Sequence, residues 1–191
     1  KDPYPLTVEE VGAKEASQDV LIAGLFNQKN FLDILQNFTV FEPVDGRIIK
    51  KIPRYQQFRA VHKTIERLKT GETRRDKSGV IWHTQGSGKS LTMVFLAVKM
   101  RRDPELRDYK LVFLTDRTQL DEQLTTTFKN AQGGTVRNAN SVKSLKELLA
   151  SDSSDIITAM VQKFQENADD FVFPLLNASD KIIVLADEAH R

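Results

Sequence analysis

The segment Gly79–Ser90 carries the residue types best suited to phosphate chemistry. It reads Gly-Val-Ile-Trp-His-Thr-Gln-Gly-Ser-Gly-Lys-Ser, an apolar run followed by a glycine loop, and the strongly apolar segment Leu91–Met100 comes next. This order predicts a strand, a phosphate-binding loop and the start of a helix. The first position of the usual G-x-x-x-x-G-K-[ST] pattern holds His83 in place of glycine.

Each residue type in this loop has a chemical reason. Glycines let the backbone turn its amide N–H groups toward a polyphosphate, where a Cβ would intrude. Lys89 is placed to reach the β- and γ-phosphates as a point charge, and the Ser90 hydroxyl is suited to ligate Mg²⁺. The helix N-terminus behind them favours negative charge. The candidate nucleotide-binding residues are Thr84, Gln85, Gly86, Ser87, Gly88, Lys89 and Ser90.

A second candidate group follows the apolar run Lys181–Ala186, which leads into Asp-Glu-Ala-His. Asp187 is suited to hold Mg²⁺ through water, and Glu188 to orient and deprotonate the water that attacks a γ-phosphate. Acids at a strand end are, by themselves, more typical of a helix cap or a solvated loop. Together with the glycine loop they predict a site for ATP or a related nucleotide with Mg²⁺.

Strands and helices must alternate to bring these residues together. Continuous apolar runs bounded by polar residues are typical of buried parallel strands, and here they alternate with helical segments. The pattern predicts an α/β fold, a mostly parallel sheet with helices on both faces, in which the polar residues after each strand share one rim. The predicted strands are Val80–Trp82, Lys110–Thr115, Ile156–Val161 and Lys181–Ala186, with a weak one at Thr135–Asn138, and the predicted helices are Gly88–Met100, one ending near Phe128, and Ser141–Leu149.

The residues ahead of the glycine loop predict a short helical segment. Asp19–Phe26 is a candidate helix capped by its first residue, and Asn30 is a candidate cap for a second helix. Thr39–Glu42 resembles a short strand followed by a turn. His62, on the mostly polar side of the next helix, is expected at the surface.

Two glutamines, Gln56 and Gln57, stand at the head of a predicted helix, Ile52–Lys69, that has Pro53 in its first turn. A glutamine amide can both donate to and accept from an adenine edge. From spacing alone a solvated helix end is the favoured interpretation, so adenine reading remains one of two alternatives.

Composition limits the other possibilities. The chain has 191 residues, 40% of them hydrophobic and 28% charged, as in an ordinary soluble globular domain. No apolar run approaches the roughly 20 residues that span a bilayer. Without cysteine, neither a disulfide nor a cysteine-ligated zinc site is available. A net charge of +2 does not by itself indicate nucleic-acid binding. The absence of an initiator Met predicts a piece of a longer protein.

The glycine loop, Asp-Glu-Ala-His and the upstream Tyr-Gln-Gln together resemble a superfamily 2 helicase or translocase. Longer strings are similar to the motor part of the R subunit of type I restriction enzymes, where the His83 departure is usual. The resemblance implies that residues 39–191 form a first RecA-like lobe, a P-loop NTPase, and that residues 1–38 form a helical lead-in. The strings are Ile-Pro-Arg-Tyr-Gln-Gln-Phe-Arg-Ala-Val (52–61), Trp-His-Thr-Gln-Gly-Ser-Gly-Lys-Ser-Leu-Thr-Met (82–93), Phe-Leu-Thr-Asp-Arg-Thr-Gln-Leu-Asp-Glu-Gln-Leu (113–124) and Val-Leu-Ala-Asp-Glu-Ala-His-Arg (184–191).

The resemblance also implies roles for single residues. Gln57 matches the adenine-reading glutamine, with Gln56 as the second choice. Two positions that often hold threonine in the family hold Ala159 and Met160 here, which weakens the prediction that a threonine contacts phosphate at this place. Lys89 and Ser90 match the family's phosphate and Mg²⁺ contacts, and Asp187 and Glu188 match its metal-holding and water-activating carboxylates. The residues that match motifs lining the DNA path are Thr115, Asp116, Arg117, Gln162 and Lys163.

For the whole protein the resemblance implies ATP-driven translocation of double-stranded DNA before cleavage, in the cytoplasm of a prokaryote. The implied partners are a second RecA-like lobe and a nuclease domain in the same chain, and specificity and methyltransferase subunits, with no membrane. One lobe without the arginine finger of the other is expected to bind nucleotide weakly and to turn over little or none. Two alternatives stay open: another superfamily 2 DNA or RNA helicase or remodeller, and a nucleotide-dependent DNA-binding module without hydrolysis.

Overall fold

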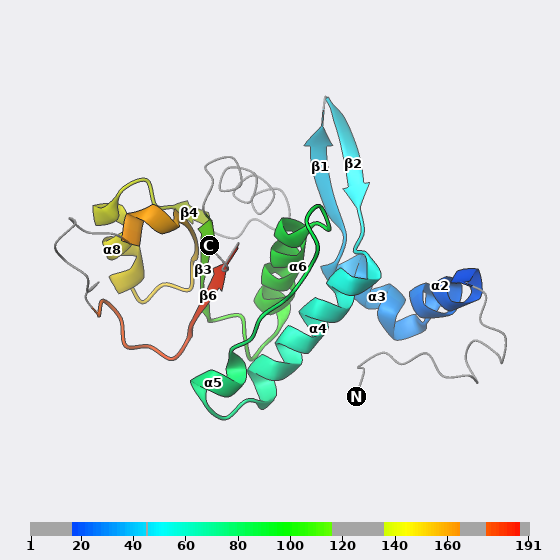
Figure 1. Cartoon of the computed structure of the whole chain (residues 1–191), viewed down its shortest axis with the longest axis horizontal. Helices are drawn as coiled ribbons and strands as arrows, with labels where there is room; N and C mark the ends of the chain where they lie inside the picture. Colours follow the sequence, from blue (N-terminus) through cyan, green and yellow to red (C-terminus); the bar gives the residue numbers. More distant parts are fainter. Residues whose placement is uncertain (1–16, 45, 116–135, 165–174, 188–191) are drawn as a thin grey trace. The chain divides into compact units, whose positions relative to one another are not determined.

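The computed structural model describes residues 17–44, 46–115, 136–164 and 175–187 of the chain. These residues belong to two compact units, Lys1–Gly88 and Lys89–Arg191 (Figure 1). Among the described residues, no helix is both long and apolar enough to cross a membrane. The elements of the first unit are α2 (Ser17–Phe26), α3 (Gln28–Asn37), β1 (Val40–Val44), β2 (Arg47–Lys51), α4 (Tyr55–Thr70) and α5 (Arg74–Lys77).

The two helices α2 and α3 confirm the predicted helical segment, but neither is capped as expected. The side chain of Asn27 accepts hydrogen bonds from the amides of Lys29 and Asn30, so Asn27 caps α3. Asn30 lies inside α3 and is buried, and its Nδ2 donates to the Gly24 carbonyl at 2.9 Å. Asp19 likewise lies inside α2. The predicted Asn30 cap was wrong because Asn27, three residues earlier, already supplies the acceptor that starts α3.

Strands β1 and β2 form an antiparallel hairpin, with Val40 opposite Lys51 and Val44 opposite Arg47. The short strand predicted here is confirmed. The second strand was not anticipated. Gly46 lies in the turn at φ +74°, in the left-handed region that glycine enters without steric cost.

Helix α4 begins two residues after Pro53 rather than including it, since Arg54 is its N-cap. One face of the helix is buried, as its apolar spacing predicts. The helix ends at Thr70, and Gly71, as predicted, is the residue that caps it. The buried stripe consists of Phe58, Val61, Ile65 and Leu68.

His62 does not lie at the open surface that was expected for it. Its ring stacks on Phe38 with centroids 5.6 Å apart and contacts Phe58 at 4.5 Å. Its Nε2 lies 2.7 Å from Oδ2 of Asp33 in α3. The surface prediction was wrong because α3 and the aromatic residues cover this side of α4, and no feature of the α4 sequence shows that cover.

The predicted strand Val80–Trp82 is absent. The structure has irregular backbone there, and the side chains of Val80 and Trp82 are 89% and 86% exposed. No described strand pairs with this run. An apolar run becomes a strand only when a neighbour satisfies its backbone hydrogen bonds, and apolar content alone does not supply one.

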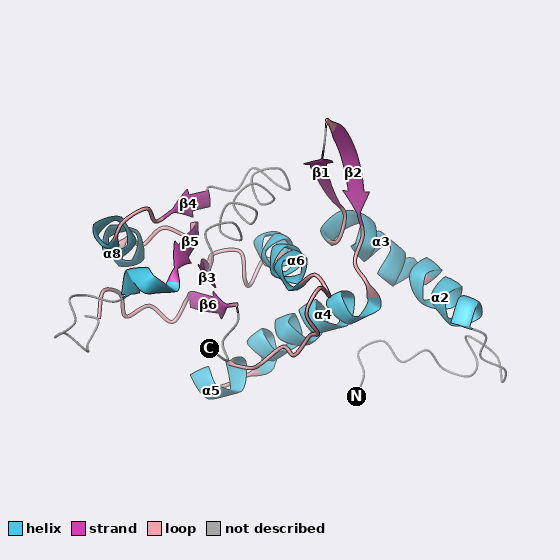
Figure 2. Ribbon diagram, turned by 45° about the horizontal axis from the view of Figure 1, so that its top comes forward, coloured by secondary structure: helices cyan, strands magenta, loops and turns pink. Residues whose placement is uncertain are grey.

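The second unit contains a four-stranded parallel sheet, as predicted, in the order β4-β5-β3-β6. Figures 1 and 2 show α6 and α8 on opposite sides of this sheet. The predicted helix ending near Phe128 lies outside the described residues. The elements are α6 (Lys89–Arg102), β3 (Lys110–Thr115), β4 (Val136–Asn138), α8 (Val142–Ala150), β5 (Ile156–Met160), the 3-10 helix η1 (Val161–Phe164) and β6 (Ile182–Ala186).

One buried cluster of this unit lies between the sheet and α8, and α6 carries further buried side chains, among them Phe95 and Met100. The cluster joins Val112 of β3, Ile157 of β5 and Leu145 of α8, all buried. Ser141 caps α8 by accepting a hydrogen bond from the Ser144 amide at 3.1 Å. The buried apolar runs therefore form the central strands, as expected for strands covered on both faces.

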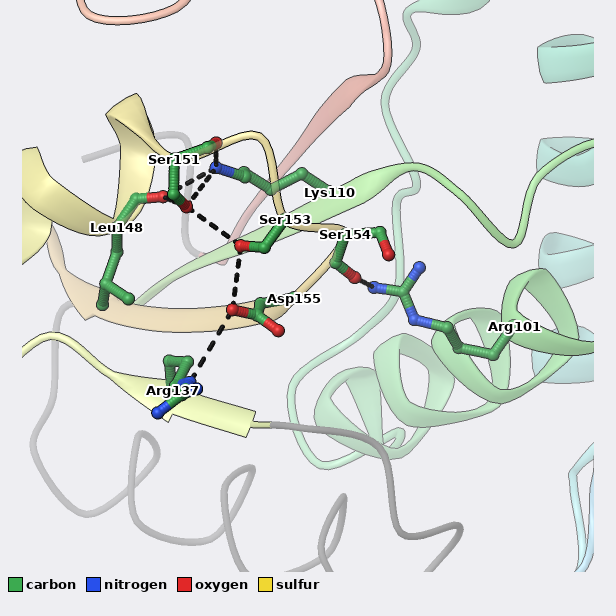
Figure 3. Close-up of polar contacts among 8 residues, drawn as sticks. All are labelled: Arg101, Lys110, Arg137, Leu148, Ser151, Ser153, Ser154 and Asp155. Carbon is green, nitrogen blue, oxygen red and sulfur yellow. Dashed lines mark hydrogen bonds and ion pairs between the residues drawn. The ribbon is translucent and has the colours of Figure 1, made fainter.

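Lys110, at the start of β3, binds the carboxyl end of α8 (Figure 3). The residue is 3% exposed, and its Nζ donates to the carbonyl oxygens of Leu148 at 2.6 Å and Leu149 at 3.1 Å. It also donates to the carbonyl of Ser151. Burial lowers the pKa of Lys110, against the raising effect of Asp155. Lys110 thus satisfies carbonyls that the end of a helix leaves unpaired.

Arg101, in the last turn of α6, binds the backbone at the same edge of the sheet (Figure 3). Its Nη1 donates to the Tyr109 carbonyl at 2.6 Å, and its Nη2 donates to the Ser154 carbonyl at 2.5 Å. Burial lowers the pKa of this guanidinium. These bonds fix α6 to the residues before β3 and β5, at the edge opposite the carboxyl ends of the strands.

Candidate nucleotide-binding site

The glycine loop that ends the first unit has the backbone that a phosphate cradle needs. Gly86 and Gly88 adopt φ values of +74° and +86°, and the Ser87 amide donates to the Thr84 carbonyl at 3.2 Å. A Cβ at Gly86 would meet nothing within 4 Å, whereas a Cβ at Gly88 would lie 2.6 Å from Nε2 of Gln57. The left-handed backbone favours glycine at positions 86 and 88, and at position 88 a Cβ would also displace the Gln57 amide.

Gln57 lies in the first turn of α4 and is 2% exposed. Its Oε1 accepts from the Arg54 amide at 2.8 Å. Its Nε2 donates to the carbonyl oxygens of Gly88 at 2.9 Å and Ser87 at 3.4 Å. Both ends of the amide are therefore bound to protein backbone. Gln56 beside it is exposed.

The loop also contains polar atoms that the protein leaves unsatisfied. Ser87 Oγ and His83 Nδ1 are buried without a hydrogen-bond partner among the described residues. Thr84 and Gln85 are exposed. Buried polar atoms usually have partners, so these atoms fit a site that binds a polar ligand. The glycine cradle and the orphaned atoms together fit a polyphosphate.

Lys89 and Ser90 are the first two residues of α6, which opens the second unit. Both are half-buried. The N–H groups in the first turn of a 14-residue helix have no intrahelical acceptor, and that end carries a partial positive charge, which favours an anion. Lys89 adds a full positive charge there, and Ser90 adds a hydroxyl.

The carboxyl ends of β3 and β6 hold two further candidates, Thr115 and Asp187. These strands are adjacent and parallel, and the Asp187 amide donates to the Leu114 carbonyl at 2.9 Å. Thr115 is fully buried, and its Oγ1 has no partner in the part of the chain that the structure describes. The structure confirms that these two residues share one edge of the sheet.

The remaining candidates are the other predicted DNA-path residues and Glu188. Gln162 is exposed in η1, just past β5, and therefore follows the same edge. Lys163 lies in η1 too, but its side chain is outside the described structure, as are Asp116, Arg117 and Glu188.

No group of three or more acidic, histidine or cysteine side chains suited to a metal ion occurs within residues 17–44, 46–115, 136–164 and 175–187. Mg²⁺ in nucleotide sites commonly takes one or two protein ligands and completes its shell with phosphates and water. The donor set of Ser90 and Asp187 fits that chemistry.

Comparison with known proteins decides the family. The family model described as SWI2/SNF2 ATPase matches residues 56–191, which is most of the chain. The chain belongs to the SWI2/SNF2 ATPase family. The match contains the glycine loop, β3 and β6 of this ATPase region, so nucleotide binding follows from the family as well as from the geometry.

This SWI2/SNF2 ATPase region is also similar to endonuclease subunits of type I restriction enzymes. It is 40% identical over 185 residues to the MjaIXP subunit of Methanocaldococcus jannaschii, which covers 94% of the chain. It is 38% identical over 178 residues to the HindI subunit of Haemophilus influenzae, covering 90%, and 30% identical to the SsaAORF53P subunit of Staphylococcus saprophyticus, covering 83%. The chain spans only 17%, 17% and 16% of these relatives.

Sequence reasoning missed the contact between Gln57 and Gly88. The contact joins a glutamine in the first turn of α4 to a glycine 31 positions later, and no pattern within either segment shows it. Helical spacing places Gln57 on the buried face with Val61, and that spacing distinguishes it from Gln56.

Proposed function

We propose that this chain is the first, ATP-binding lobe of the DNA-translocating motor of a type I restriction enzyme R subunit. The observation that carries the proposal is the 40% identity to such a subunit, over a stretch that contains a glycine loop with two left-handed glycines. The domain division proposed with it is a lobe at residues 39–191 and a lead-in at residues 1–38.

Bound MgATP supplies the phosphoanhydride bond to be broken, and the residues of this chain hold it and activate water. The backbone of Gly86–Gly88 and Lys89 bind the phosphates, while Ser90 and Asp187 hold Mg²⁺. Glu188 accepts a proton from the attacking water. This assignment uses the loop geometry and the fixed backbone of Asp187 as its support.

The DNA path is proposed along the edge where β3 and β5 end. Thr115 ends β3 and Gln162 follows the adjacent strand β5, so the two residues lie at one edge of the sheet, with Gln162 exposed there and Thr115 buried beneath it. The proposal extends to Asp116, Arg117 and Lys163, which are neighbours in sequence. Phosphate contacts of this kind position the motor without reading sequence.

In the whole protein this lobe acts with a second RecA-like lobe and a nuclease domain, and the complex includes specificity and methyltransferase subunits. Double-stranded DNA is the proposed track, and the prokaryotic cytoplasm the proposed location. These points rest on the similarity to restriction enzyme subunits of two bacteria and an archaeon.

The experiment that tests the proposal measures ATP hydrolysis by the full-length protein with double-stranded DNA, single-stranded DNA or RNA. If the protein is a motor that moves along duplex DNA, double-stranded DNA is expected to stimulate its ATP hydrolysis most strongly. Stronger stimulation by RNA or single strands would favour another superfamily 2 helicase. Binding of ATP and DNA with no hydrolysis would favour a binding module.

A further inference from the structure

Resting on the proposed motor function, we propose that the β1–β2 hairpin is a contact surface for duplex DNA, in addition to the residues proposed at the edge of the sheet. The hairpin consists of Val40–Val44 and Arg47–Lys51, paired antiparallel over their whole length. No third strand among the described residues pairs with either of them. Figures 1 and 2 show the hairpin extending away from α3 and α4 of the same unit. A two-stranded ribbon of this kind fits the major groove of B-form DNA.

The hairpin exposes large apolar side chains that nothing described covers. Four of the five residues of β2 are exposed. Ile48 is 76% exposed, and Phe41 on the facing strand is 53% exposed. An isolated two-stranded hairpin is marginally stable in water, and exposed apolar groups of this size are typical of interaction sites. The exposure therefore indicates a binding surface.

The charge of the segment that contains β2 favours a polyanionic partner. From Gly46 to Ile65 the sequence has six basic residues and no acidic one, although the net charge of the whole chain is only +2. The rest of the chain is therefore net negative. Such clustering of positive charge is the electrostatic signature of a nucleic-acid surface. The six residues are Arg47, Lys50, Lys51, Arg54, Arg59 and Lys63.

Two of these cations, Arg47 and Lys50, are exposed on the hairpin, and neither forms an ion pair with a described residue. Lys51, in contrast, binds Glu42 on the facing strand. The other acid of the hairpin, Asp45, lies outside the described residues. Because successive side chains of a strand alternate between its faces, Arg47 and Lys50 lie on opposite faces, about 10 Å apart along the strand. A ribbon in a groove about 12 Å wide can thus offer one cation to each phosphate backbone.

The arrangement on one face of the ribbon favours DNA over a protein partner. Lys50 lies opposite Phe41 and shares its face with Ile48. The cores of protein–protein interfaces are depleted in lysine, because its charge must be desolvated there. In a DNA groove, apolar side chains contact thymine methyl groups while a cation binds phosphate, so both kinds of side chain are satisfied.

The test measures how tightly the full-length protein binds a short fluorescent duplex at several salt concentrations. Arg47→Gln combined with Lys50→Gln removes two charges from exposed positions. Each lost phosphate contact lowers the slope of log affinity against log salt concentration by about 0.9, so we expect this slope to fall by about 1.8. The matched control, Lys29→Gln with Lys143→Gln, also removes two exposed charges and should bind DNA as wild type does.

The outcomes separate the hairpin contact from the proposed motor. Equal salt slopes for the hairpin variant and the control overturn the hairpin contact, while hydrolysis of ATP stimulated by duplex DNA in the wild type still supports the motor. Absence of duplex binding by the wild type overturns both.

A second measurement locates the contact without any substitution. Acetylation of Lys50, followed by mass spectrometry, is expected to slow when duplex DNA is added, and acetylation of Lys29 and Lys143 is expected to stay unchanged. Equal protection of the three lysines would overturn the contact. Ile48→Ser distinguishes a protein partner, since we expect weaker DNA binding and unchanged assembly with partner subunits. Loss of assembly at unchanged DNA affinity would assign the hairpin to a protein interface and overturn the inference.

Discussion

The backbone amide of Asp187 donates a 2.9 Å hydrogen bond to the Leu114 carbonyl, one step past the last ladder pair of β3 and β6, Leu114 with Ala186. The sheet therefore fixes the position of Asp187 through its backbone. The residue lies directly past the carboxyl end of β6, at the edge of the sheet where ligands bind in open α/β folds.

Replacing Asp187 by Asn keeps this backbone bond and removes the charge. If Asp187 holds the metal as proposed, DNA-stimulated ATP hydrolysis by the full-length protein is expected to fall by at least about 100-fold, because the metal loses a charged ligand. The control is Asp152→Asn, an exposed acid beyond α8, which should hydrolyse ATP as wild type does. Hydrolysis by Asp187→Asn close to the wild-type rate would remove Asp187 from the metal site.

The two loop glycines predict different costs. In Gly86→Ala the new methyl group has no neighbour within 4 Å, so the only expected cost is the strain of a left-handed backbone, about 1–2 kcal/mol. Gly88→Ala has the same strain and also collides with Gln57. MgATP binding, measured by calorimetry, is therefore expected to weaken more in Gly88→Ala. Equal or reversed losses would show that the contact with Gln57 is not formed in solution.

Lys110→Met tests the cap at the end of α8. The substitution leaves the carbonyls of Leu148 and Leu149 without their donor in a buried place, at an expected cost of about 2–3 kcal/mol in the free energy of unfolding. Urea unfolding measures this cost through the midpoint at unchanged slope. Lys143→Met, exposed on α8, is the matched control and should be nearly neutral. A similar small effect of both variants would refute the cap.

The turn before α5 predicts a pH dependence. Hydrogen bonds from the hydroxyl and amide of Thr73, with the charge of Arg67, lower the pKa of Asp76 below 3.8. Because the folded pKa is the lower one, the stabilising contribution is present above pH 3.8 and is lost as the pH falls through the folded value. An NMR titration of the Asp76 carboxyl carbon is expected to show a midpoint below 3.8 that rises in Thr73→Ala. An identical midpoint in both proteins would contradict the capping bonds.

The central strands of the second unit, β3 and β5, were predictable because they are buried along almost their whole length. In Lys110–Thr115 the four residues between the polar ends are all apolar, because a strand buried on two faces does not alternate apolar with polar residues. The prediction that the polar residues after the strands share one edge of the sheet required only that the strands pair in parallel. Lys110 itself was not anticipated as a cap, since its acceptors are about 40 positions away in sequence.

The first unit was harder to predict, because its decisive contacts join segments that sequence patterns treat as independent. Val80–Trp82 has strand-like composition but no described partner, so it does not form a strand. His62 lies on the mostly polar side of α4, yet Asp33 of α3 contacts it. Helical spacing separates Gln57, on the buried face with Val61, from the exposed Gln56, but it does not show that the buried amide contacts the glycine loop.

The central proposal is that ATP bound by the glycine loop, Lys89 and Ser90 is hydrolysed to drive movement of the protein along duplex DNA. The most direct test follows displacement of a triplex-forming oligonucleotide from duplex DNA by the full-length protein assembled with its partner subunits and MgATP. The account predicts displacement after a lag that grows with distance along the duplex. It predicts none with Lys89→Ala, and wild-type displacement with the exposed control Lys143→Ala. Displacement by Lys89→Ala at the wild-type rate would contradict the account.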